Sequence, residues 1–416
     1  MLLELALRSL WQRRSSVLLT LLSLALGVFI VLGVEHIRSQ TRASFTRTIS
    51  GVDLIVGART SQLNLLLYSV FRIGNATNDI RWSSYEALAA DPRVAWAIPL
   101  ALGDSHRGYR VVGTTSAYFE HFRYGDTELL AFVAGSGFAG TYSVVLGADV
   151  ARTQHYGLDS ELVLSHGLVA TRFNEHQQRF RVSGILEPTG TPVDQAVYVT
   201  LQGIEALHLD WQGGTPLPGR AAQVLEAEAA LLQPAAVTAV LLGLQSRLAV
   251  FGLQREINEY DAEPLTAIMP GVALAELWQS MRLVEGVLQL ISALVLLASL
   301  LGLVTMLLVS LQQRQRELAL YRAIGAPAFF ILLLLELEAL LLATGALVLG
   351  SLLLLALQLF GAQWLQSNYG VNLAAVPDAR LLMYALVFLG LSAALALLPA
   401  LGAYRASLQG RLAGSE

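Results

Sequence analysis

The sequence contains no lysine, because all 27 basic residues among its 416 are arginine. A Walker A phosphate loop needs a lysine that reaches the β- and γ-phosphates, so we expect that the chain does not hydrolyse ATP by itself. Schiff-base chemistry and Ser-Lys catalysis are excluded for the same reason. Cysteine is also absent, which excludes disulfide bonds, a thiolate nucleophile and cysteine-ligated metals.

Charge is scarce as well. Only 14% of the residues are charged, whereas 55% are hydrophobic. A soluble protein has about a quarter of its residues charged. The composition therefore predicts an integral membrane protein with the lipid bilayer as a partner, and the net charge of −4 argues against nucleic acid as another.

Four apolar runs are long enough to cross a bilayer, whose core of about 30 Å requires roughly 20 helical residues. We expect transmembrane helices at residues 16–37, 284–310, 327–360 and 381–402. The third run is longer than a perpendicular helix needs, so it must tilt or project beyond the membrane. A cleaved signal peptide is the alternative for the first run, but the run is long for one and no small-residue cleavage site follows.

Arginines in short loops predict the orientation. They precede the first run, lie between the second and third, and follow the fourth: Arg8, Arg13, Arg14, Arg314, Arg316, Arg322, Arg405 and Arg411. We therefore expect three cytoplasmic segments: an amphipathic helix at 1–15, a helix at 311–326 and a tail at 403–416.

Two segments are then expected outside the cytoplasm, a large domain at 38–283 and a short loop at 361–380. Arg38, Arg42 and Arg47 oppose this orientation. They do not reverse it, because long domains translocate largely regardless of charge.

The large domain has the pattern of an α+β fold. β-branched and aromatic residues predict strands at 107–113, 178–186 and 196–200. The apolar run 236–244 is too short to span a membrane and predicts a buried strand.

Two helices are predicted in the same domain. Ser83–Ala90 opens with a capping-box pattern formed by Ser83 and Glu86. Residues 246–260 have helical periodicity, with the apolar residues Leu248, Phe251 and Ile257 on one side.

The loop between the second and third runs carries the sharpest motif, RQRELALYRAIGAP from Arg314 to Pro327. Leu318 and Tyr321 lie one helical turn apart, and Gly325 and Pro327 close the stretch. The pattern predicts a short cytoplasmic helix that is presented to a protein partner.

This loop resembles the signature of the MacB/FtsX-type permeases of ABC transporters, the type VII or mechanotransmission systems. The signature is filled by Arg314, Glu317, Leu318, Ala319, Leu320, Arg322, Ala323, Ile324, Gly325 and Ala326. Further resemblances lie at the N-terminal elbow (7–14), in two blocks of the outer domain (145–151 and 180–186), at Glu338, Gly345 and Gly350, and at the C-terminal ending (399–406).

The resemblance implies four transmembrane helices with a MacB-like periplasmic core domain, in the bacterial inner membrane with both termini cytoplasmic. It implies a dimer, preferentially a homodimer, that grips two cytoplasmic ABC ATPases. No fused ATPase precedes the first run, so a separate ATPase subunit would use ATP and Mg²⁺, and the chain itself would bind no cofactor. A periplasmic adaptor or substrate protein is a further expected partner.

In this interpretation Leu318 and Tyr321 pack into the ATPase, and Arg314, Glu317 and Arg322 form a polar rim. Arg316, Ala323 and Gly325 complete the coupling helix. The chain itself would be non-catalytic.

Three functions remain open on the sequence. The leading hypothesis is a permease that extracts or exports a hydrophobic or amphipathic substrate, such as a lipoprotein, lipid or peptide. The alternative is a transmembrane signal transducer that activates a periplasmic enzyme or sensor without transport. A membrane enzyme that uses Glu336 or Glu338 is the third.

Glu336 and Glu338 lie in the third apolar run, where a carboxylate is costly and is a functional candidate by default. A proton relay would need a partner charge at similar depth, and the other three runs offer none. A structural role is therefore favoured, either capping or pairing with the arginines of 314–322.

No catalytic or metal-binding constellation is predicted. The histidines are scattered without metal-ligand spacing: His36, His106, His121, His155, His166, His176 and His208. Asp53, Asp104 and Asp194 fall in loop-like surroundings, so we expect no metal site and no catalytic residue.

Overall fold

The computed structural model describes residues 2–167, 175–209, 211–212, 215–216, 226–229, 231–369 and 379–408. The chain divides into two compact units. The first, Met1–Arg42 with Met281–Glu416, is called the membrane unit below. The second, Ala43–Ser280, is called the large domain.

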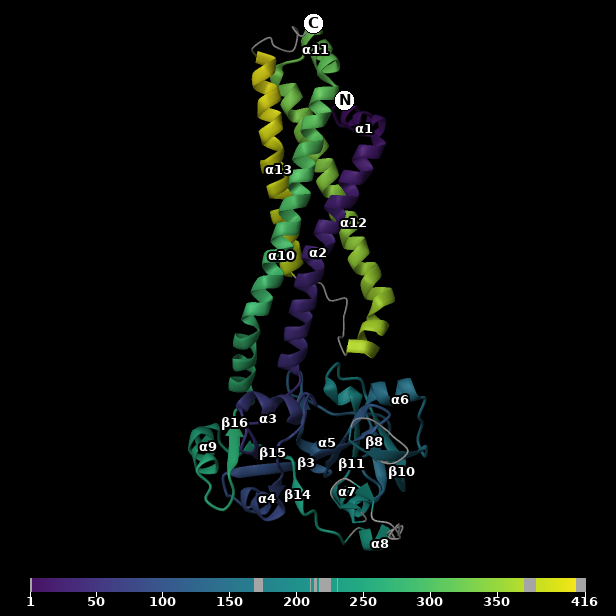
Figure 1. The fold of residues 1–416 in the computed structure, drawn as a ribbon, viewed down its shortest axis with the longest axis vertical. Coiled ribbons are helices and arrows are strands. Elements are labelled where there is room, and N and C mark those ends of the chain that lie inside the picture. The colour runs from purple at the N-terminus through teal and green to yellow at the C-terminus, as the bar shows by residue number, and fades with distance from the viewer. Residues whose placement is uncertain are drawn as a thin grey trace. The chain divides into compact units, whose positions relative to one another are not determined.

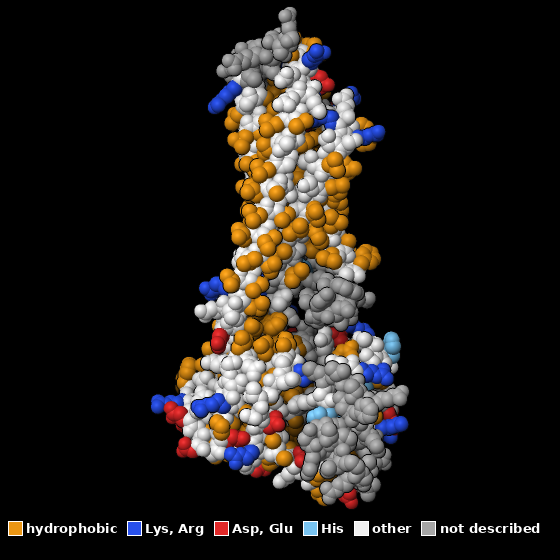
Figure 2. Space-filling model, in the orientation of Figure 1, with side chains coloured by type: hydrophobic (Ala, Val, Ile, Leu, Met, Phe, Trp, Pro, Cys, Tyr) orange, Lys and Arg blue, Asp and Glu red, His pale blue; other side chains and the backbone are white. Residues whose placement is uncertain are grey.

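The membrane unit is built from helices (Figure 1). They are α1 (Leu2–Gln12), α2 (Arg14–Arg47), α10 (Pro270–Gln313), α11 (Gln315–Ala323), α12 (Ala328–Tyr369) and α13 (Ala379–Leu408). Within the described residues, four of them contain segments long and apolar enough to cross a bilayer: Arg14–Arg47, Pro270–Gln313, Ala328–Gly361 and Leu381–Arg405. On the side shown in Figure 2, apolar side chains cover most of the length of these helices. The four predicted membrane helices are therefore confirmed.

The helices extend beyond the apolar runs that predict them. Helix α2 continues to Arg47, and α10 already begins at Pro270. Helix α12 continues to Tyr369, so much of the expected loop 361–380 is helical, and residues 370–378 lie outside the described part. Of the expected tail, residues 403–408 belong to α13, and 409–416 lie outside the described residues.

Small residues allow the membrane helices to approach closely. A Cβ added to Gly350 on α12 would lie 2.8 Å from the carbonyl oxygen of Ala25 on α2. One added to Gly27 on α2 would lie 2.5 Å from Ser299 Oγ on α10. Because lipid tails are as apolar as leucine, such close packing is a main source of helix association in a bilayer.

The large domain combines strands and short helices. In chain order they are β1 (Leu54–Ala58), α3 (Gln62–Ser69), β2 (Ile80–Arg81), α4 (Trp82–Ala89), β3 (Val94–His106), β4 (Tyr109–Thr114), α5 (Ala117–His121), β5 (Arg123–Tyr124), β6 (Glu128–Leu129), β7 (Phe132–Gly135), β8 (Ser143–Leu146), α6 (Ala148–Gln154), β9 (Glu161–His166), β10 (Glu175–Leu186), η1 (Pro192–Gln195), β11 (Ala196–Thr200), α7 (Leu201–His208), β12 (Trp211–Gln212), β13 (Thr215–Pro216), α8 (Glu226–Ala229), β14 (Ala236–Val237), β15 (Ala239–Leu244), η2 (Arg247–Ala249), α9 (Val250–Asn258) and β16 (Leu265–Ile268).

One mixed sheet organises this domain, in the order β16-β1-β15-β3-β4-β11-β8-β10-β7 among the described strands, with β9 paired to both β10 and β3. The β4–β11 and β8–β10 pairs are parallel. Strands β1, β8 and β11 are buried along their whole length, as expected for strands covered on both faces.

The predicted strands are confirmed as β4, β10, β11 and the pair β14 and β15. Two details of the predicted helices are wrong. Helix α4 begins at Trp82, so Ser83 lies inside it and cannot form the predicted capping box, and Trp82 Nε1 donates to Glu86 Oε1 at 2.9 Å instead.

The second error concerns the buried side of the helix predicted at 246–260. Helix α9 buries Val250, Leu253 and Ile257, whereas Leu248 and Phe251 are 94% and 71% exposed. The helix starts after a 3-10 turn that contains Leu248. The prediction applied the α-helical period to this turn as well, and it therefore selected the wrong face of the helix.

Candidate functional site: the α11 helix and a buried ion network

A break in the helix separates α11 from α10. At Arg314 the backbone (φ −107°, ψ 14°) leaves the helical range between Gln313 and Gln315. At the other end, Gly325 adopts φ +99°, and the Ala326 N–H donates to the Tyr321 carbonyl at 3.0 Å. Glycine favours this left-handed turn, which satisfies carbonyls at the helix end. The short helix closed by Gly325 is therefore confirmed.

One face of α11 is turned into the chain. Leu318 is 3% exposed and packs in a cluster with Ile331, Leu335 and Ala400, which lie on α12 and α13. Tyr321 is half-buried beside this cluster, with its ring 6.0 Å from the ring of Phe330. This packing fastens α11 to its neighbours, and it makes Leu318 inaccessible to a partner that binds from outside.

The opposite face of α11 is open. Leu320 and Ile324, one turn apart, are 59% and 76% exposed, and Arg316 and Ala323 are exposed beside them. Arg322, predicted as part of a polar rim, donates instead from Nη1 to the Ala326 carbonyl at 2.9 Å. The apolar residues available to a partner are therefore Leu320 and Ile324 rather than Leu318.

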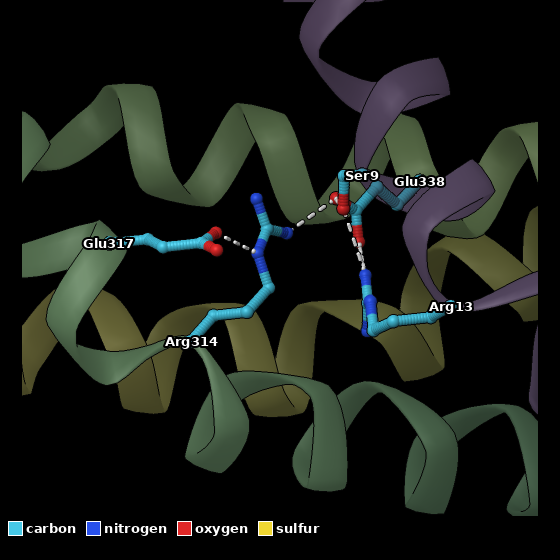
Figure 3. A network of polar contacts seen from close by, with 5 residues as sticks. All are labelled: Ser9, Arg13, Arg314, Glu317 and Glu338. Carbon is cyan, nitrogen blue, oxygen red and sulfur yellow. Dashed lines mark hydrogen bonds and ion pairs between the residues drawn. The ribbon is translucent and has the colours of Figure 1, made fainter.

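A buried ion network lies where α11 begins (Figure 3). Glu338 on α12 is fully buried, and its Oε1 accepts from Arg314 Nη1 at 2.8 Å and from Ser9 Oγ at 2.6 Å. Its Oε2 accepts from Arg13 Nη2 at 3.1 Å. Arg314 Nε also donates to Glu317 Oε2 at 2.9 Å. The network thus joins α1, the junction of α1 and α2, the break before α11, and α12.

The charges in this network balance. Arg13 and Arg314 carry two positive charges, and Glu317 and Glu338 carry two negative charges. Burying a single charge costs several kcal/mol, which is offset only where the ion is paired and its remaining hydrogen-bonding sites are satisfied. Glu338 meets this condition, because its two carboxylate oxygens accept from three donors.

The two acidic residues of α12 therefore differ. Glu338 forms the ion pair with Arg314 that the sequence interpretation favoured. Glu336 is only partly buried, and its Oε1 has no hydrogen-bond partner among the described residues. The roles of both residues stay predictions.

Sequence reasoning missed the contacts of Ser9 and Arg13 with Glu338. Both residues were placed in the N-terminal elbow, and Arg13 was counted as a charge that sets orientation, but neither was connected with the third apolar run. Ser9 is one turn before Arg13, and Arg13 Nη2 donates to its Oγ at 2.9 Å. A buried acid on one apolar helix should have prompted a search for arginines next to the ends of the others.

A second ion cluster in the membrane unit neutralises Arg38. Of the three arginines that oppose the predicted orientation, Arg38 is the one closest to the first apolar run. The Arg38 guanidinium donates two hydrogen bonds to the buried Glu35 carboxylate, from Nη2 to Oε1 at 2.7 Å and from Nε to Oε2 at 3.0 Å. Arg38 Nη1 also lies 3.6 Å from Glu285 Oε2 on α10.

Comparison with known proteins agrees with this arrangement. The family model of the MacB-like periplasmic core domain matches residues 17–240, and that of the FtsX-like permease C-terminal domain matches residues 290–408. The first match alone covers more than half of the chain. The chain therefore belongs to the MacB/FtsX-type family of ABC transporter permeases, and the predicted family and fold are confirmed.

Two solved structures are similar at low identity. The periplasmic region of MacB from Actinobacillus actinomycetemcomitans is 11% identical, with 57% of this chain and 95% of that one covered at a TM-score of 0.34. The extracellular domain of the noncanonic ABC-type transporter YknZ from Gram-positive bacteria is 12% identical, with 52% and 98% covered at a TM-score of 0.30. No curated protein matches the chain. The family assignment rests on the two family models.

Proposed function

We propose that this chain is the permease subunit of an ABC transporter that couples ATP hydrolysis by a separate ATPase to movement of its large domain. The observation that carries the proposal is the division of α11 into two faces. One face is fastened to α12 and α13 through Leu318, and the other exposes Leu320 and Ile324. A partner that binds the open face would move α11 and its neighbours together.

Continuous helices provide a path for such a movement. Helix α10 is a single helix from Pro270 to Gln313. Ala273, Leu274 and Leu277 near its start belong to the buried core of the large domain, and its end leads into Arg314. In this proposal, a displacement of α11 passes along α10 to the large domain.

In this proposal the termini and α11 are cytoplasmic, the large domain is periplasmic, and the membrane is the bacterial inner membrane. The ATPase subunit binds ATP and Mg²⁺, and this chain is non-catalytic. Two copies of the chain form a homodimer around two ATPases, and an adaptor or substrate protein binds on the periplasmic side. The cargo is a hydrophobic or amphipathic molecule that is extracted or exported.

The test is purification of the tagged full-length chain from its native membranes, followed by an ATPase assay in nanodiscs. We expect a Walker A protein to co-purify, and Ile324→Asp to reduce the associated ATPase activity at least about tenfold by placing a charge in an apolar contact. Ile73→Asp is the matched control, because Ile73 is 52% exposed in the large domain. An Ile324→Asp variant that retains the full activity contradicts the proposal.

Transport is distinguished from signal transduction by a release assay. Nanodiscs or proteoliposomes that contain the chain, its ATPase and a fluorescent lipoprotein should release the lipoprotein when ATP is added. Release that requires neither ATP nor the ATPase contradicts transport. ATP-driven activation of a periplasmic enzyme with no release would favour the transducer instead.

A further inference from the structure

Three histidines and one aspartate of the large domain converge on one point. They are Asp104 in β3, His166 at the end of β9, His176 near the start of β10 and His208 at the end of α7. One ligand atom from each lies within 4.8 Å of the others. The predicted loop-like surroundings of Asp104 are wrong, because it lies inside β3. The three histidines, which are scattered along the sequence, meet in the folded chain.

The sheet itself assembles the group. Asp104 and His166 are direct cross-strand partners in the antiparallel β3–β9 pair. Strands β9 and β10 also pair antiparallel, with Ser165 opposite Glu175. His166 and His176 flank this pair on opposite sides, so they are diagonal neighbours on one face of the sheet. Side chains of cross-strand partners stand on the same face of a sheet and are therefore close neighbours. The end of α7 brings His208 to the same place.

The distances fit a small coordination sphere. Asp104 Oδ1 lies 3.1 Å from His166 Nδ1, 3.5 Å from His208 Nε2 and 3.9 Å from His176 Nε2. His166 Nδ1 and His208 Nε2 are 3.3 Å apart. With metal–ligand bonds of about 2.0–2.1 Å, the ligand atoms of a regular zinc tetrahedron are about 3.3–3.4 Å apart. Only His176 must move appreciably to complete such a sphere.

The ring orientations favour coordination over stacking. The planes of His166 and His208 are inclined at 84°, those of His166 and His176 at 84°, and those of His176 and His208 at 75°. The three rings are therefore not stacked face to face, and one ligand atom of each lies in the group described above.

The site is deep but accessible. The Asp104 and His176 side chains are each 2% exposed, whereas those of His166 and His208 are 39% and 32% exposed. Gly103 and Gly167, the sequence neighbours of Asp104 and His166, line a pocket of about 430 Å³. His166 and His208 therefore form the exposed side of the group, and Asp104 and His176 its buried side.

The ligand types at the site also favour a cation. A carboxylate oxygen and the unprotonated nitrogen of an imidazole are both common metal ligands in proteins. A set of three nitrogens and one carboxylate oxygen, without a thiolate, suits Zn²⁺ and its neighbours rather than Mg²⁺ or Ca²⁺.

We propose that Asp104, His166, His176 and His208 together bind one divalent transition-metal ion of the zinc class. Four protein ligands fill a tetrahedron and leave no open position, so the site is structural or regulatory rather than hydrolytic. The bound ion links the β3, β9 and β10 strands to α7. This inference does not depend on the coupling role of α11.

The test is calorimetric titration of the full-length chain in nanodiscs with Zn²⁺, after EDTA treatment and with a purification tag that contains no histidine. We expect about one Zn²⁺ per chain and no saturable binding of Mg²⁺. His208→Asn should weaken Zn²⁺ binding at least about tenfold, because it removes one of four ligands. His155→Asn is the matched control, since His155 is an exposed histidine outside the group.

Two further results make the test decisive. Asp104→Asn should abolish binding, and if this buried variant does not fold, the partly exposed His208→Asn still decides. Co²⁺ in place of Zn²⁺ should give the intense visible absorption of a tetrahedral site. The proposal is overturned if the wild type binds no stoichiometric Zn²⁺, if His208→Asn binds as tightly as His155→Asn, or if Co²⁺ shows only the weak absorption of an octahedral aqua ion.

Discussion

Two buried carboxylates, Glu338 in the membrane unit and Asp104 in the large domain, have different partners. Glu338 is 0% exposed and is held by two guanidinium groups and a hydroxyl. Asp104 is 2% exposed and is surrounded by three imidazoles. Arginine cannot lose its proton in a protein and offers no lone pair, whereas neutral histidine does. The partners of Glu338 therefore cannot bind a metal ion, whereas the histidines around Asp104 can offer lone pairs to one.

The largest expected effect is in the membrane unit. Glu338→Leu leaves Arg13 and Arg314 buried with their main partner removed. Breaking a buried pair in this way costs about 3–5 kcal/mol, which should be measured as loss of stability during unfolding of the detergent-solubilised chain.

Glu336→Leu is the control for this experiment. It removes a carboxylate two residues earlier on the same helix, and none of the described residues pairs with its Oε1. Equal destabilisation by both substitutions would show that helix packing, and not the ion network, determines the stability of the membrane unit.

The second-largest expected effect is stabilisation by Zn²⁺, which should be specific to the large domain. At a free concentration of about 100 times its dissociation constant, Zn²⁺ should stabilise the domain by about 2.7 kcal/mol, because it binds the folded state preferentially. Asp104→Asn should remove this gain, and Glu338→Gln should leave it unchanged. Differential scanning calorimetry with and without EDTA provides the measurement, and an identical gain in the Asp104→Asn variant would contradict the comparison.

A smaller loss of stability is expected for Gly350→Ala, a substitution that tests how much the membrane unit depends on close helix packing. Gly350→Ala places a methyl group 2.8 Å from a backbone oxygen of α2, and overpacking of this kind costs about 1–3 kcal/mol. Gly390→Ala on α13 is the control, since a Cβ there meets nothing within 4 Å. Similar unfolding midpoints for the two variants would show that α2 and α12 can separate freely.

The smallest effect is expected at an exposed pair. Arg8 and Glu4 on α1 are 2.8 Å apart, but their side chains are 76% and 65% exposed. Solvent and salt screen such pairs, so Glu4→Gln should cost about 0.5 kcal/mol or less and still less at high salt. A loss as large as that of Glu338→Leu would mean that α1 is not exposed to solvent at this point.

The sequence predicted features that depend on local pattern. Apolar runs predicted the four membrane helices, alternation predicted β4, β10 and β11, and Gly325 predicted the end of α11. Each of these follows from propensities over a few neighbouring residues.

The features that sequence reasoning missed depend on tertiary structure. Helix α11 has two apolar faces, Leu318 with Tyr321 and Leu320 with Ile324, and only packing against Ile331 and Ala400 reveals which one is covered. Asp104 and the three histidines around it come from three strands and a helix, and no metal-ligand spacing along the chain signals their convergence. Only the nine residues between His166 and His176, a separation compatible with a hairpin, could have suggested one of the contacts.

The most direct test of the central claim is photo-crosslinking from single positions on α11 in native membranes. The account predicts that a photoreactive amino acid at Leu320 or Ile324 forms an adduct with an ABC ATPase, and that one at Leu318 does not. An ATPase adduct from Leu318 with none from Leu320 and Ile324 would contradict the account, because the buried face of α11 would then be the face that binds the partner.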